Sequence, residues 1–163
     1  MIAETPHDPE PAAHITIAVA SLPAPALDLA LSRCTEAGAH AFVVFAADRS
    51  VGRGEKLDRW TSICREAAML AGRLRVPEVS AASSFAAAYA SAENPVVLER
   101  DAPRRLAEVE GLEQATLFVG PEGGWSDRER QLAGVTASLG PRNLRADTAA
   151  LVALAVALSS GGR

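Results

Sequence analysis

Residues 117–150 read LFVGPEGGWSDRERQLAGVTASLGPRNLRADTAA and contain two glycine-bearing loops. The first loop, residues 120–124, follows an apolar run and precedes a helix whose start is marked by a capping box of Ser126 and Glu129. The second loop, residues 139–145, leads into an apolar C-terminal segment. Glycine lets the main chain approach a ligand closely, and a helix start offers free N–H groups. The pair of loops therefore predicts a ligand site made largely of backbone.

The first loop alone is compatible with two interpretations. It is neither a Walker loop nor a GxGxxG loop, so it fits a phosphate cradle and a purely structural turn equally well. The second loop adds two arginines and an acid at a helix start. If both loops follow strands of a parallel sheet, they lie at its C-terminal edge, where open α/β folds bind ligands.

Apolar runs of strand length alternate with segments of helical periodicity along the chain. This order predicts an α/β fold with a mostly parallel sheet and helices on both faces. The pattern predicts strands over residues 14–20, 41–46, 76–79, 95–98 and 115–119, and helices over residues 26–37, 56–72, 83–92, 104–110, 127–137 and 147–160.

Composition indicates one globular domain. The chain has 163 residues, of which 48% are hydrophobic and 22% charged. A net charge of −4 argues against a protein held to nucleic acid by bulk charge alone. Residues 1–13 are rich in proline and acids, so we expect a flexible tail or linker remnant before a domain over residues 14–163.

No pattern indicates a metal site, a secretory leader or a membrane span. Cys34 and Cys64 belong to no metal-ligand cluster, so they are expected to be buried thiols in a reducing compartment. The most apolar window, residues 149–158, is too short to cross a membrane. These features predict a cytoplasmic protein.

Several motifs occur in an order that resembles a known family. They are GPEGGW at 120–125 with SDRE at 126–129, LGPRNLRADTAA at 139–150, RCTEAG at 33–38, DRS at 48–50, RW at 59–60, EAAMLAGR at 66–73 and VP at 76–77. Together, over residues 14–158, they resemble the RsmE-type methyltransferases of the SPOUT superfamily, which methylate N3 of a uridine in bacterial 16S ribosomal RNA.

The resemblance implies a homodimer with a deep C-terminal trefoil knot and active sites near the dimer interface. It also implies S-adenosylmethionine as the cofactor and 16S ribosomal RNA, or the small ribosomal subunit, as the partner. By position, the residues implied to line the cofactor pocket are Leu98, Glu99, Gly120, Glu122, Gly123, Gly124, Leu139, Gly140, Asn143 and Leu144.

The reaction suggests catalytic candidates, because uridine N3 is a poor nucleophile until it loses its proton. Arg145 and Arg142 are candidates for steadying the uracil anion or a flanking phosphate. Glu122 and Asp147 are candidate proton acceptors, although Asp147 equally fits an N-cap of the last helix. The candidate RNA contacts are Arg49 and Arg73.

Departures from the family pattern keep other functions open. Asp147 replaces a glutamate, Leu70 a glutamine and Asn143 an apolar residue. The sequence also lacks the PUA-like RNA-binding domain that usually precedes this domain, so we expect either an excised catalytic domain or a short homologue. The alternatives are a weak or inactive SPOUT-fold dimer that binds RNA or cofactor, and a methyltransferase with a different RNA target.

Overall fold

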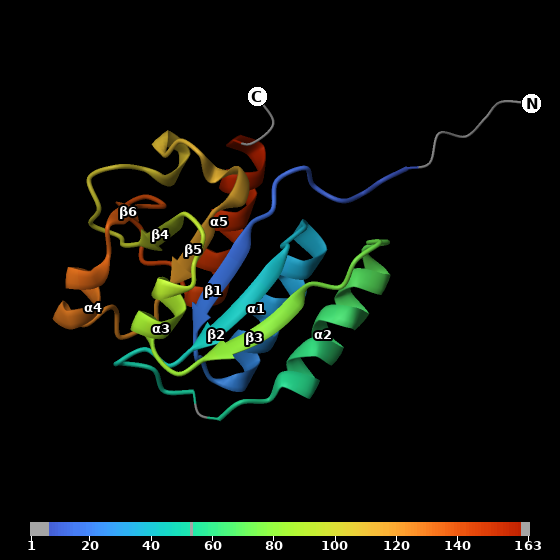
Figure 1. Ribbon diagram of the computed structural model, residues 1–163, viewed down its shortest axis with the longest axis horizontal. Helices are drawn as coiled ribbons and strands as arrows, with labels where there is room; N and C mark the ends of the chain where they lie inside the picture. The colour runs from blue at the N-terminus through green and yellow to red at the C-terminus, as the bar shows by residue number, and fades with distance from the viewer. Residues whose placement is uncertain (1–6, 53, 161–163) are drawn as a thin grey trace, which may run out of the picture.

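Six parallel strands form a single sheet in the order β3-β2-β1-β5-β4-β6 (Figure 1). The structure is a computed structural model that describes residues 7–52 and 54–160. The strands are β1 (Thr16–Ala20), β2 (Ala41–Phe45), β3 (Glu78–Ala82), β4 (Pro95–Leu98), β5 (Thr116–Val119) and β6 (Val135–Ala137). The predicted α/β class with a mostly parallel sheet is confirmed.

Helices cover both faces of the sheet, as predicted (Figure 1). On one face lie α1 (Ala24–Ala37), α2 (Leu57–Leu70) and α5 (Ala146–Ser160). The short helices α3 (Phe85–Ala90) and α4 (Asp127–Leu132) lie on the other. Two 3₁₀ turns, η1 (Leu106–Glu108) and η2 (Leu112–Gln114), connect β4 to β5.

The two faces have different cores. The larger core packs the branched side chains of β1 and β5, such as Ile17 and Leu117, against α1 and α5. The smaller core is aromatic and contains Phe45, Phe85 and Phe118 beneath α3. Every residue of β5 is buried, which explains why this strand reads as an unbroken apolar run.

The helix predicted over residues 127–137 is wrong in its second half. The helix ends at Leu132, and Val135–Ala137 forms the edge strand β6 beside β4. Gly134 interrupts the helical periodicity, and its N–H donates to the hydroxyl of Tyr89 at 2.9 Å. The second glycine loop therefore follows a strand, as the first one does.

Part of the predicted tail contacts the domain. The carboxylate of Glu10 accepts hydrogen bonds from the side chain of Arg73 and from the backbone N–H groups of Leu74 and Arg75. Pro11 packs against Gly38, where a Cβ would lie 2.6 Å from its Cγ. Residues 10–13 thus dock on the domain; residues 1–6 lie outside the described residues.

Candidate functional site

The first glycine loop connects β5 to α4 and contains a tight turn. The N–H of Gly124 donates to the carbonyl of Pro121 at 2.9 Å, and Gly124 has a φ of 77°, a conformation that favours glycine. The turn exposes the side chain of Glu122. Ser126 then caps α4, and Glu129 completes the predicted capping box.

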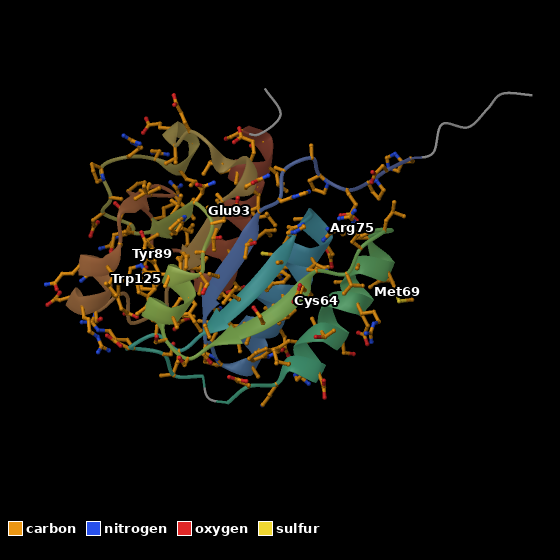
Figure 2. The ribbon with its side chains drawn as sticks, in the orientation of Figure 1. Cys64, Met69, Arg75, Tyr89, Glu93 and Trp125 are labelled. Carbon is orange, nitrogen blue, oxygen red and sulfur yellow. The ribbon has the colours of Figure 1, made fainter. Side chains whose placement is uncertain are left out.

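Trp125 fixes this loop to the neighbouring strand. Its indole N–H donates to the carbonyl of Leu98 at 2.9 Å, and its ring stacks on Phe45 with a centroid separation of 6.1 Å. A Cβ at Gly120 would lie 2.9 Å from Cε2 of the indole, so only glycine fits beneath the ring. Figure 2 shows Trp125 and Tyr89 on the α3 and α4 side of the sheet.

The segment that follows β2 also forms hydrogen bonds with the first glycine loop and with α4. Nη1 of Arg49 donates to the carbonyl of Gly123 at 3.0 Å, and the N–H of Asp48 donates to Glu129 at 3.2 Å. Hydrogen bonds from Arg128 and Ser126 lower the pKa of the Asp48 carboxyl. Segments far apart in sequence therefore hold the glycine turn in one geometry.

The second glycine loop follows β6 and is fixed by Ser138. The buried hydroxyl of Ser138 accepts from the N–H of Gly140 at 3.0 Å and donates to the carbonyl of Arg100 at 2.9 Å. Gly140 has a φ of 114°. The loop ends at Arg145, whose carbonyl accepts the first helical hydrogen bond of α5 from Ala149 at 2.8 Å.

A cavity of about 650 Å³ lies between the two loops at the C-terminal ends of β4 and β5. This volume suits a ligand the size of a nucleoside cofactor. Every residue assigned to the cofactor pocket from the sequence lines this cavity: Leu98, Glu99, Gly120, Glu122, Gly123, Gly124, Leu139, Gly140, Asn143 and Leu144. Their role in binding stays a prediction, but the structure brings them together.

Charged groups line part of the cavity. Glu99 pairs with Arg130 of α4 at 3.1 Å. Arg142 and Arg145 also line the cavity, and neither forms an ion pair with another of the described residues. The site thus combines a few apolar side chains with backbone-rich turns and with guanidinium groups that form no ion pair among the described residues. This combination suits a cofactor with an apolar ring system beside an anionic substrate.

The sequence was compared with models of known protein families. The family model of the RNA methyltransferase domain matches residues 8–158. The chain belongs to the RNA methyltransferase domain family.

Relatives and solved structures agree with this family. The chain is 33% identical over 150 residues to ribosomal RNA small subunit methyltransferase E from Bacillus subtilis, covering 78% of this chain and 59% of that protein. It is 35% identical over 156 residues to the Synechocystis protein of the same name, covering 86% of this chain and 52% of that one. The chain thus spans little more than half the length of these relatives.

A crystal structure of ribosomal RNA small subunit methyltransferase E from Neisseria gonorrhoeae, bound to S-adenosyl methionine, superposes with a TM-score of 0.83. The two proteins are 28% identical, and the match covers 90% of this chain and 65% of that chain.

Two predicted residues of this RNA methyltransferase domain lie away from the cavity. Asp147 is 7% exposed and pairs with Arg33 of α1 at 3.6 Å, so its carboxylate is not part of the cavity lining. The N-cap interpretation of Asp147 is also wrong, because α5 begins at Ala146 and Arg145 holds the capping position. Each helical residue turns about 100°, so this small offset directs Asp147 toward α1.

The structure places Arg73 in contacts within the domain and away from the cavity, so its assignment as an RNA contact stays a prediction. Its side chain is 5% exposed and pairs with Glu10, while Nη1 donates to the carbonyls of Thr35 and Ala39 at 3.0 and 2.8 Å. The second candidate RNA contact, Arg49, is exposed, and its Nη1 donates a hydrogen bond to the carbonyl of Gly123. The buried position of Arg73 depends on the docked tail.

Sequence reasoning missed several residues that line the cavity. Trp125 lies within a motif that the resemblance used, but the indole hydrogen bond depends on β4 lying beside β5. Arg100, Asp101 and Arg130 also line the cavity. The run RDAPRR over residues 100–105 is the only local signal that could have directed attention to this rim.

The described residues give little indication of other kinds of site. Over residues 7–52 and 54–160, no group of three or more His, Cys, Asp and Glu side chains is arranged to hold a metal ion. In that same part of the chain, every helix is too short or too polar to cross a bilayer.

Proposed function

We propose that this domain transfers a methyl group from S-adenosylmethionine to N3 of a uridine in 16S ribosomal RNA. The cavity between two glycine turns carries the proposal, because its volume, backbone-rich walls and arginines suit both the cofactor and an anionic substrate. The relatives named for small-subunit ribosomal RNA methylation support the RNA class. A ribosomal substrate also implies action in the cytoplasm.

The residues around the cavity fit the cofactor. S-adenosylmethionine supplies an electrophilic methyl group on a sulfonium centre. Leu98, Leu139 and Leu144 offer apolar contacts for an adenine ring. Gly124 leaves the backbone of the first turn open to a ligand, because a Cβ there would meet nothing nearer than 4.0 Å. The carboxylate of Glu122, which also lines the cavity, can offset the positive charge of the sulfonium.

The chain's own residues prepare the nucleophile. Uridine N3 becomes nucleophilic only after its proton is lost, and the exposed Glu122 at the turn is the candidate acceptor. Arg142 and Arg145 form no ion pair with another described residue, and their guanidinium groups stabilise the negative charge of the uracil anion or of a flanking phosphate. The fixed loops align the acceptor nitrogen with the methyl group, which is the main requirement of a direct transfer.

The proposal includes a homodimer. Residues 149–158 of α5 are all apolar; Ala150 and Leu154 are buried, whereas Val152 and Ala155 remain exposed. An exposed apolar helix face of this kind suits burial against a second copy of the chain. Val152→Glu is expected to convert the dimer to a monomer in analytical ultracentrifugation; a wild-type monomer would contradict this part of the proposal.

The trefoil knot is also part of the proposal. β6 lies at the edge of the sheet, yet α5 returns to pack on β1, β5 and α1. Residues 138–145 must therefore cross back over the sheet between these elements, which suits a chain threaded through its own loop.

The decisive experiment combines binding and transfer. S-adenosylmethionine is titrated calorimetrically, and tritiated cofactor is then supplied with small subunits that lack the modification. We expect saturable binding and labelled 3-methyluridine after nucleoside digestion. No heat at millimolar cofactor would contradict the cofactor assignment.

A binding module without transfer is the second candidate. The orientation of Asp147 toward Arg33 favours it, because this removes one of the two predicted proton acceptors from the cavity. Saturable cofactor binding without any labelled RNA, on subunits and on naked RNA, is the result expected for such a module.

A further inference from the structure

Two arginine side chains from different segments meet over Gly140 at the rim of the cavity. A Cβ built on Gly140 would lie 3.0 Å from Nη2 of Arg142 and 3.8 Å from Nη1 of Arg105. Arg142 belongs to the second glycine loop, and Arg105 to the connection between β4 and η1. The two guanidinium groups therefore border the same glycine.

The backbone holds Arg105 in this place. Arg105 forms a parallel bridge with Ser138, the residue that fixes the second loop. On either side, the carbonyl of Arg104 accepts from the N–H of Ser138, and the N–H of Leu106 donates to the Ser138 carbonyl, both at 2.9 Å. The N–H of Arg105 donates to the carboxylate of Glu108 at 2.8 Å. Its side chain thus projects from a fixed base.

The charges at this rim are not compensated. Among the described residues, Arg104, Arg105, Arg142 and Arg145 form no ion pair, whereas most other arginines do, namely Arg33, Arg59, Arg73, Arg100, Arg128 and Arg130. Two nearby acids are already paired, Glu99 with Arg130 and Asp101 with Arg100, and the carboxylate of Glu108 accepts from the backbone N–H of Arg105.

Two like charges that share one glycine repel each other unless an anion lies between them. Guanidinium groups are suited to this task, because their planar donors match the oxygens of a phosphate. All four of these arginines are exposed, so an RNA phosphate reaches them from solvent.

We propose that Arg105 and Arg142 form a clamp for one RNA phosphate next to the target nucleotide, with Arg104 and Arg145 contacting the flanking backbone. The clamp rests on the proposed function, since it supplies the RNA grip for the same cavity. It also accounts for binding of a polyanion by a chain with a net charge of −4, because the positive charge is gathered where the base must enter.

The test measures RNA and cofactor binding separately on the whole chain. A short fluorescein-labelled single-stranded RNA is titrated at several salt concentrations with wild type, R105Q, R142Q and the double variant. The matched control is R65Q, which removes one exposed arginine of α2 that forms no ion pair with another residue of the described part of the chain. Calorimetry with S-adenosylmethionine is run on R105Q and R65Q.

We expect R105Q to weaken RNA binding about three- to tenfold and to lower the slope of log K against log salt by roughly 0.7 to 1. Cofactor affinity of R105Q stays at the wild-type value. The double variant loses less than the product of the two single losses, because both arginines hold the same phosphate. R65Q keeps the wild-type RNA affinity.

Other results overturn the clamp. They are an R105Q variant that binds RNA like R65Q, a wild-type chain that binds no RNA, and an R105Q variant that loses cofactor affinity while RNA binding is kept. Failure of the proposed function gives a different result. In that case the wild-type chain binds RNA, R105Q weakens this binding, and no subunit is methylated. Methylation with equal RNA affinity in R105Q and R65Q refutes the clamp alone.

Discussion

Replacing Arg73 with methionine tests whether this residue supports the fold or contacts RNA. The side chain is 5% exposed and makes hydrogen bonds to Glu10 and to the carbonyls of Thr35 and Ala39. Methionine fills part of the volume but leaves the carboxylate and both carbonyls without these donors. Breaking a buried ion pair from one side costs about 3 to 5 kcal/mol, a large share of the roughly 5 to 15 kcal/mol that stabilises a domain.

Urea denaturation followed by circular dichroism measures this loss. With a slope of roughly 2 kcal/mol per molar urea, the midpoint of unfolding is expected to fall by about 2 M. Arg75→Met is the matched control, because Arg75 is exposed and forms no ion pair among the described residues (Figure 2). The free energy of unfolding of this control is expected to stay within about 0.5 kcal/mol of wild type.

Two results would refute this reasoning. One is an Arg73→Met variant with wild-type stability, which would mean that the contact with Glu10 does not hold the N-terminal segment. The other is wild-type stability combined with weaker RNA binding, which would support the assignment of Arg73 as an RNA contact. Glu10→Gln separates the partners, because it removes the charge but keeps one oxygen that can accept from the N–H groups of Leu74 and Arg75.

Three further predictions follow from the packing and the titrating groups. Gly120→Ala forces its Cβ against the fixed ring of Trp125, so calorimetry is expected to show at least about tenfold weaker S-adenosylmethionine binding and urea unfolding a loss of about 1 to 3 kcal/mol. Burial raises the pKa of the Cys34 thiol to about 12, so iodoacetamide at about pH 8 is expected to label it only after unfolding, as read by mass spectrometry. The hydrogen bond from Arg73 lowers the pKa of the Glu10 carboxyl, so its stabilising contribution is complete above the ordinary glutamate pKa and is lost as the pH falls through the lowered value. In Glu10→Gln, the free energy of unfolding is expected to fall less as the pH is lowered through this range. The same pH dependence as in wild type would contradict the role given to the Glu10 carboxylate.

The sequence predicted the centre of the fold better than its edges. The apolar runs at residues 41–46, 95–98 and 115–119 became β2, β4 and β5, because strands buried on both faces must be apolar throughout. The edge strands were harder to predict. β3 starts two residues later than predicted and extends to Ala82, and β6 has only three residues after a short amphipathic helix. A strand this short carries no periodicity of its own, and its pairing with β4 defines it.

The candidate site could also be predicted only in part from the sequence. Gly124 and Gly140 lie in the two loops that the sequence analysis selected, and both have a positive φ and line the cavity. The direction of a side chain depends on contacts that local patterns do not contain. Arg73 is buried by a segment about sixty residues away, and Asp147 faces α1 because the last helix begins one residue earlier than predicted. The Arg105 rim likewise depends on β6 pairing beside β4.

Trp125 gives the cavity an optical signal of its own. The chain has two tryptophans, and only Trp125 lines the cavity; Trp60 is buried in the core between α1 and α2. Indole emission responds to the polarity and the quenching groups around the ring. Because the ring of Trp125 is tied to the end of β4 and covers Gly120, any rearrangement of the first glycine loop changes its surroundings while those of Trp60 stay the same. In a Trp60→Phe background, the intrinsic fluorescence of the chain therefore reports the state of the cavity without an added label.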